Sequence, residues 1–258
     1  MEIKNKHMDI DSNLNRKGRT LVFGDAHGAN KALLQVLERC NFDYENDTLI
    51  SLGDIADGWS ETPECVDTLL NIKNLISIRG NHDVWCYDWF KYGDRPMIWT
   101  QQGGQATIDA YIRTNKLIDP AHRTFWENQQ DWYIDENNNL FIHAGFAYYL
   151  EGDFEKQASY KVNAGSIARE CHWDRDLLTG AISAEKTKNT FKATEQFNKV
   201  FIGHTALKEE IPLKFKNLWN LDTGAGWYGK LTIMDIDTEE YWQSDNMKTL
   251  YPNERGRG

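Results

Sequence analysis

Six side chains that carry oxygen or imidazole donors follow short apolar runs in this sequence. They are Asp25, His27, Asp54, Asn81, His143 and His204. Donors of these types suit manganese, iron, zinc or a mixed pair of ions. Two ions held about 3.5–4 Å apart share a bridging carboxylate and a bridging water, and they stabilise both oxygens of an in-line displacement. The residue types therefore predict a site for two divalent metal ions.

Asp54 lies in the middle of this set and is the natural bridging carboxylate. Asp25 and His27 are expected to complete the shell of one ion, and the other shell is expected to contain Asn81, His143 and His204. A glycine precedes Asp25, Asp54 and Asn81. Because glycine lets the backbone turn sharply off a strand, it allows a close approach to the ions.

The elements that must position these donors are predicted from apolar runs at 20–24, 48–52, 75–78, 140–142 and 199–202. Each run is short and rich in β-branched or aromatic residues, which is typical of buried strands. Helical patterns at 30–39 and 64–72 separate the first three runs, and this order indicates an α/β fold with a parallel sheet. Ligands bind at the carboxyl ends of such strands, so the donors are expected to meet in one site.

The second half of the chain follows a different pattern. Strands are expected at 217–222 and 230–237, joined by a glycine-rich turn region. A third strand at 239–243 would complete an antiparallel element. One domain is therefore expected to span residues 19–250.

Residues 84–135 contain five tryptophans and predict a largely helical insert that caps the site. Core packing explains these tryptophans more simply than a binding platform does, although an exposed ring could stack on a nucleobase. The segments outside the domain, 1–18 and 251–258, are expected to be flexible tails.

Composition narrows the classes of partner. The net charge is −10 and the isoelectric point is near 5.2, so a surface built for nucleic acid or an anionic membrane is not expected. No run approaches the roughly 20 apolar residues of a membrane span, and residues 1–19 lack the apolar core of a secretory signal. The four cysteines show no metal-binding spacing, which favours reduced thiols and a cytoplasmic location.

Five motifs together resemble those of the calcineurin-like metallophosphoesterases. In this sequence they are residues 24–28 (GDAHG), 53–58 (GDIADG), 80–83 (GNHD), 143–145 (HAG) and 203–204 (GH). The segments 222–226 and 229–232 resemble the closing strands of the phosphoprotein phosphatase branch, which includes bacterial and phage serine/threonine phosphatases and symmetrical diadenosine tetraphosphate hydrolases. The resemblance covers residues 20 to about 236. It implies a four-layer α/β/β/α sandwich with mixed sheets.

The resemblance also implies how the reaction proceeds. A hydroxide that bridges two metal ions, most often manganese, attacks phosphorus, so no covalent phosphoenzyme is expected. His82 is expected to protonate the leaving oxygen, and Asp57 to orient His82. Capping of the following helix is a simpler role for Asp57. Phosphate contacts are expected from Arg175, Asn81 and His82.

One departure from the family pattern concerns the substrate. The branch usually has an arginine directly after the residue that matches Asp57, and it contacts the substrate phosphate. Gly58 and Trp59 stand there instead, whereas the segment 172–175 resembles the one that supplies a second arginine, here Arg175. Arg175 could hold the phosphate alone, although a surface salt bridge is an equal alternative for it.

The favoured function is therefore a phosphomonoesterase similar to serine/threonine protein phosphatases, acting on a phosphorylated protein or a small phosphate ester. The alternative is a symmetrical dinucleoside polyphosphate hydrolase with a nucleotide substrate. An inactive binding scaffold is disfavoured because every expected ligand is present. A nuclease is disfavoured because the chain is acidic, and phosphate backbones require basic tracks.

Overall fold

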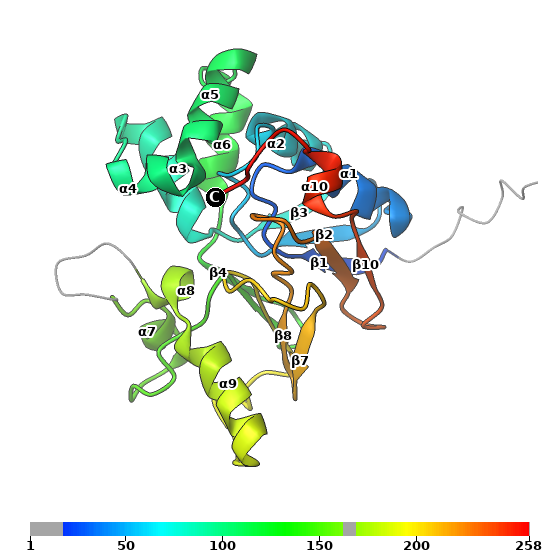
Figure 1. Ribbon diagram of the computed structural model, residues 1–258. Helices are drawn as coiled ribbons and strands as arrows, with labels where there is room; N and C mark the ends of the chain where they lie inside the picture. The colour runs from blue at the N-terminus through cyan, green and yellow to red at the C-terminus, as the bar shows by residue number, and fades with distance from the viewer. Residues whose placement is uncertain (1–17, 162–168, 258) are drawn as a thin grey trace, which may run out of the picture.

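The computed structural model describes residues 18–161 and 169–257, which fold around two five-stranded sheets (Figure 1). The first sheet has the order β10-β9-β1-β2-β3. Its strands are β1 (Thr20–Phe23), β2 (Thr48–Ser51), β3 (Asn74–Ser77), β9 (Thr232–Asp235) and β10 (Tyr241–Gln243). Strands β1, β2 and β3 are parallel, whereas β9 runs antiparallel to β1 and to β10. The carboxyl ends of β1, β2 and β3 therefore lie at one edge.

The second sheet has the order β4-β5-β6-β8-β7. Its strands are β4 (Trp132–Ile134), β5 (Leu140–Ile142), β6 (Val200–Ile202), β7 (Leu213–Phe215) and β8 (Leu218–Asn220). Strands β5, β6 and β8 are parallel, and the edge strands β4 and β7 are antiparallel to their neighbours. Both sheets are therefore mixed, as the resemblance predicted.

Helices flank the sheets. The first half contributes α1 (Asn30–Arg39), α2 (Thr62–Leu70), α3 (Asn81–Tyr92), α4 (Met97–Trp99), the π-helical η1 (Thr100–Gly104), α5 (Gln105–Thr114) and α6 (Pro120–Asn128). The second half contributes α7 (Phe154–Ala158), α8 (Glu170–Trp173), α9 (Asp176–Thr187) and α10 (Met247–Leu250). Across the described ranges, no helix combines the length and apolar character needed to cross a membrane.

The four layers follow from the alternation of side chains along each strand. Val22 of β1 packs between the sheets with Phe201 of β6. Its neighbours Leu21 and Phe23 point to the opposite face and pack with α1 and α2. Val200 and Ile202 likewise pack with α9 on the outer face of the second sheet. Strands covered on both faces must be apolar throughout, which explains the short apolar runs and confirms the predicted α/β/β/α fold.

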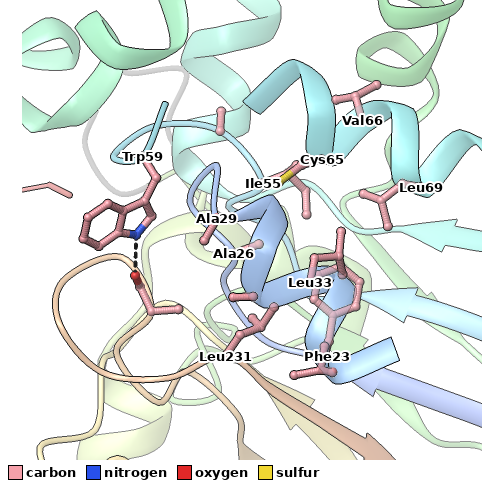
Figure 2. Packing of buried hydrophobic residues seen from close by; sticks show 14 of the residues in the cluster. Phe23, Ala26, Ala29, Leu33, Ile55, Trp59, Cys65, Val66, Leu69 and Leu231 are labelled. Atoms are coloured by element: carbon pink, nitrogen blue, oxygen red, sulfur yellow. Dashed lines mark hydrogen bonds between the residues drawn. The ribbon is translucent and has the colours of Figure 1, made fainter. Parts of the chain in front are cut away.

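The helices of the tryptophan-rich insert extend the first core. Figure 2 shows part of this core, where Ile55, Cys65 and Leu69 pack beside Leu33 of α1. Trp89, Trp99 and Trp126 belong to the same cluster and are at most 3% exposed. Core packing, rather than a binding platform, is therefore the role of these three rings.

Two expectations differ from the structure. Strands β8 and β9 were expected to form one hairpin, but they lie in different sheets, because β8 pairs with β6 and β7 while β9 pairs with β1. The segment 222–231 therefore crosses from one sheet to the other. Residues 251–258 were expected to be a flexible tail. In the described part, 251–257, Tyr251 is 2% exposed and stacks on Trp59 with ring centroids 4.9 Å apart.

Candidate metal centre

Two groups of buried donors lie where the parallel strands of the two sheets have their carboxyl ends. The two groups share one carboxylate. The first group is Asp25, His27 and Asp54, and the second is Asp54, His143 and His204. Within each group the ligand atoms lie within 4.8 Å of one another. Asn81 joins them, since its Oδ1 lies 3.1 Å from His143 Nε2 and 2.9 Å from His204 Nδ1. The structure thus brings together all six donors that were predicted from the sequence.

Sharp backbone turns deliver these side chains. His27, Asp54 and His204 have φ values of 47°, 52° and 66°, in the left-handed region that residues with side chains rarely adopt. Gly53 has a φ of 99°, and a Cβ there would lie 2.5 Å from the backbone nitrogen of Gly80. Such conformations are costly and concentrate at functional sites.

Hydrogen bonds that two imidazole rings donate to the backbone fix their orientation. Nδ1 of His27 lies 3.1 Å from the carbonyl oxygen of Ala56, and Nδ1 of His143 lies 2.7 Å from that of Leu52. A carbonyl can only accept, so both rings carry a proton on Nδ1. In the neutral form of each ring, Nε2, which lies 3.6 or 3.5 Å from Asp54 Oδ2, would present a lone pair to a cation.

The buried charges also fit cations. Burial raises the pKa of Asp25 well above its usual range, and the neighbouring Asp222 raises it further. Burial also raises the pKa of Asp222 to about 6. At Asp54 burial acts in the same direction, but the charge of His143 and other nearby groups outweighs it and lowers the pKa. Within the described residues, His204 Nε2 is buried without a hydrogen-bond partner. Divalent cations would neutralise the carboxylates and satisfy this nitrogen.

His82 and Asp57 form a buried pair beside these donors. Nδ1 of His82 lies 2.7 Å from Oδ2 of Asp57. Asp57 also accepts hydrogen bonds from Trp99 Nε1 at 2.7 Å and Thr107 Oγ1 at 2.8 Å. Helix α2 begins only at Thr62, and Asp57 does not cap it. The capping alternative is therefore wrong, because the Asp57 carboxylate is bound to His82 and to the insert.

Burial disfavours charge on both members of this pair. It lowers the pKa of His82 to about 3, and it raises the pKa of Asp57 well above its usual range. The His82 ring lies edge-on to the His27 ring, with centroids 5.0 Å apart. His82 Nε2 is buried and, within the described residues, has no hydrogen-bond partner. The ring is therefore held at Nδ1 and available at Nε2.

Arg175 lies at the rim of the site. Arg175 is exposed, and its Nη1 donates to Thr205 Oγ1 at 3.2 Å. Thr205 directly follows the donor His204 in the chain. Among the described residues, the recorded side-chain interaction of Arg175 is with this hydroxyl and not with a carboxylate.

Sequence reasoning missed three side chains at the site. Asp83 accepts hydrogen bonds from the backbone of Ile55, Ala56 and Gly80, and so joins the second and third motifs. Asp222 is the last residue of the strand predicted at 217–222, and this position at a strand end could have indicated that it belongs to the site. Arg257 lies with Nη1 3.4 Å from His27 Nε2, in a segment whose polar composition gave no signal.

The sequence model of the calcineurin-like phosphoesterases matches residues 18–206 of this chain. The chain belongs to this family. Members hydrolyse phosphate esters with a dinuclear divalent metal centre, so the protein is a phosphoester hydrolase and its two joined donor groups are the candidate centre.

Relatives in this family have different named activities. Serine/threonine-protein phosphatase 2 of Salmonella typhimurium is 27% identical, over 90% of this chain and 98% of its own length. The symmetrical bis(5'-nucleosyl)-tetraphosphatase of Pasteurella multocida is 21% identical, over 89% of this chain and 98% of its own length. A crystal structure of a metallophosphoesterase from Sphaerobacter thermophilus shares the fold, with a TM-score of 0.52, 16% identity and 90% coverage of each chain.

Proposed function

We propose that this phosphoester hydrolase is a phosphomonoesterase similar to serine/threonine protein phosphatases. The observation that carries the proposal is the pair of donor groups that share Asp54, with the His82–Asp57 pair beside them. The shared carboxylate suits two ions acting on one phosphoryl group. The similarity to serine/threonine-protein phosphatase 2 of Salmonella typhimurium supports the same class of enzyme.

In this proposal manganese is the native metal, and the six donors hold it. Asp25 and His27 would hold one ion, and Asn81, His143 and His204 would hold the other. Asp54, which both donor groups share, would contribute to both. Two divalent ions, when bound, lower the pKa of a shared water and stabilise negative charge on the phosphoryl oxygens. The protein contributes fixed ring orientations and a buried environment in which these charges interact strongly.

His82 is the proposed general acid in its protonated form, which a charged Asp57 carboxylate at Nδ1 would favour, and Asp57 is its positioning residue. The leaving oxygen needs a proton when the ester is not activated. Asp57 binds His82 Nδ1, and the hydrogen bonds from Trp99 and Thr107 hold the carboxylate in place. The substrate phosphate is proposed to contact Asn81 and His82 inside the site and Arg175 at its rim.

A dinucleoside polyphosphate is the second candidate substrate, and two half-buried indoles favour it. Trp85 lies 5.2 Å from the His82 ring, and Trp173 lies 6.1 Å from the His204 ring, between ring centroids. The two indoles are 5.3 Å apart. A nucleobase could stack on this pair while its phosphate chain reaches the donors.

The cysteine side chains support a cytoplasmic location, which we also propose. Cys40, Cys65, Cys86 and Cys171 are buried and free. Unpaired thiols of this kind suit a reducing compartment.

A panel of substrates tests the proposal. The manganese-loaded protein and a chelated control would be given phosphothreonine peptide, p-nitrophenyl phosphate, diadenosine tetraphosphate and single-stranded DNA. We expect turnover of the first two substrates, dependence on manganese, and no turnover of DNA. Cleavage of the dinucleotide without cleavage of either monoester would replace the favoured function by the alternative. DNA cleavage at moderate salt would overturn both.

A further inference from the structure

The segment 251–257 is anchored to the loop that follows Asp57. In Figure 1 this red segment leaves α10 and runs toward the helices of the first half. Glu254 accepts hydrogen bonds from the backbone and side chain of Ser60 at 3.0 and 2.9 Å. The Arg257 amide donates to the Gly226 carbonyl at 3.0 Å. The stacking of Tyr251 on Trp59 completes an attachment that brings Arg257 to the metal centre.

Three glycines leave a slot for the aliphatic part of Arg257. A Cβ at Gly58 would lie 3.1 Å from Arg257 Cγ, and one at Gly103 would lie 3.4 Å from the same atom. A Cβ at Gly226 would lie 3.0 Å from Arg257 Cδ. These glycines come from three separate parts of the chain, and each allows the close approach of another segment. Arg257 thus occupies a shaped position rather than a loose surface one.

The guanidinium group of Arg257 is poorly satisfied by the protein. Its Nη1 lies 3.4 Å from His27 Nε2, and its Cζ lies 5.3 Å from the centre of the Trp227 ring. Within residues 18–161 and 169–257, its Nε is buried without a hydrogen-bond partner. Partly buried guanidinium groups are normally paired with an anion.

Electrostatics indicate which anion would pair with it. A fixed positive charge beside two divalent cations is repelled unless negative charge lies between them. A phosphoryl group at the metal centre supplies that charge, and its oxygens match the planar fork of a guanidinium.

We infer that Arg257 is a substrate-binding residue that contacts the phosphoryl group at the metal centre. This inference rests on the proposed phosphomonoesterase function. The residue after Asp57 is Gly58, whose lack of a side chain leaves room for the stem of Arg257. The chain therefore supplies from residue 257 a guanidinium that the loop after Asp57 lacks. Arg175, whose Nη1 donates to Thr205 beside His204, would contact the same group.

Inorganic phosphate is the probe for this inference. Its binding to the manganese-loaded protein would be measured by calorimetry for wild type, Arg257→Ala, Arg257→Lys and Arg255→Ala. Arg255→Ala is the matched control, because Arg255 is exposed and its substitution removes the same charge two residues earlier in the chain. We expect Arg257→Ala to bind phosphate about 10- to 100-fold more weakly, as loss of a charge-assisted contact predicts. Arg257→Lys should fall between Arg257→Ala and wild type, and Arg255→Ala should match wild type.

Bound manganese, counted in the same samples, separates phosphate binding from an effect on the metals. Unchanged phosphate affinity in Arg257→Ala overturns the inference, and so does weaker affinity accompanied by loss of manganese. The KM for p-nitrophenyl phosphate should rise by the same factor as the phosphate Kd. If the wild-type protein hydrolyses no monoester, the proposed function fails, yet the phosphate titration still decides the role of Arg257.

Discussion

The variant His82→Asn tests the proposed proton donor while leaving the six metal donors in place. It removes the imidazole, with its buried Nε2, and keeps a small polar group near Asp57. Loss of a general acid slows reactions by about 10²- to 10⁴-fold when the leaving group needs a proton. We therefore expect a loss in this range for phenyl phosphate. For p-nitrophenyl phosphate, whose leaving group is stable as an anion, the loss should be about tenfold or less.

The substitution should leave the protein folded. It breaks one buried hydrogen bond, while Asp57 keeps those from Trp99 and Thr107. Such a loss costs about 1–3 kcal/mol, against a total stability of roughly 5–15 kcal/mol for a domain. For a chain of this size each kcal/mol lowers the melting temperature by about 2–4 °C. Activity and melting temperature can therefore be measured on the same folded variant.

The assay compares kcat for the two esters at saturating manganese. The matched control is His122→Asn, because His122 is also buried and bound to an aspartate, with Nε2 3.1 Å from Asp67, but in the helical insert. This control should lose stability without distinguishing the esters. An equal loss on both esters in His82→Asn, or no loss on phenyl phosphate, would refute the assignment of His82 as the acid.

Three further changes have defined outcomes. Asp54→Asn should reduce bound manganese from two ions toward none, measured by elemental analysis, because both donor groups share Asp54. Trp173→Ala should raise KM for diadenosine tetraphosphate by about tenfold and leave KM for p-nitrophenyl phosphate unchanged if a base stacks there. Burial raises the pKa of Asp174 from 3.8 to about 7, so folding favours the protonated carboxyl group. The stability of the folded protein therefore falls as the pH rises from about 4 to about 7. Asp174→Asn keeps an acceptor for the Leu177 amide, so denaturant titration should show a gain of roughly 1–3 kcal/mol at pH 8 and none below pH 4.

The gathering of the six donors could be predicted because each follows a strand. These strands have three or four residues and lie in short apolar runs, which can be recognised in the sequence. The end of each run indicates where the next side chains lie. The division into two sheets carried no comparable local signal. Strands β8 and β9 are both buried along their whole length, and nothing in either run indicates which neighbour it pairs with. Pairing was decided by packing between distant segments, so proximity in sequence suggested the wrong hairpin.

Arg257 was beyond prediction for a related reason. The segment 251–257 is polar apart from Tyr251, and polar segments near a chain end usually lack fixed structure. Its order depends on Trp59 and Ser60, which are close only in the folded protein. Gly58 and Trp59 stood out in the sequence as a departure from the family pattern, but a departure does not indicate what replaces the missing group.

The conformations and buried charges that form the site lower the stability of the fold. Left-handed backbone at His27, Asp54 and His204, together with buried carboxylates at Asp25 and Asp222, costs energy in the metal-free protein. These costs are confined to one edge, where the parallel strands of both sheets end, while the layers beneath are filled by apolar side chains. Bound cations neutralise the carboxylates, so metal binding and folding are coupled. Except for Asp222, these costly residues are among the six proposed to hold the ions, and the surrounding apolar layers keep them in position.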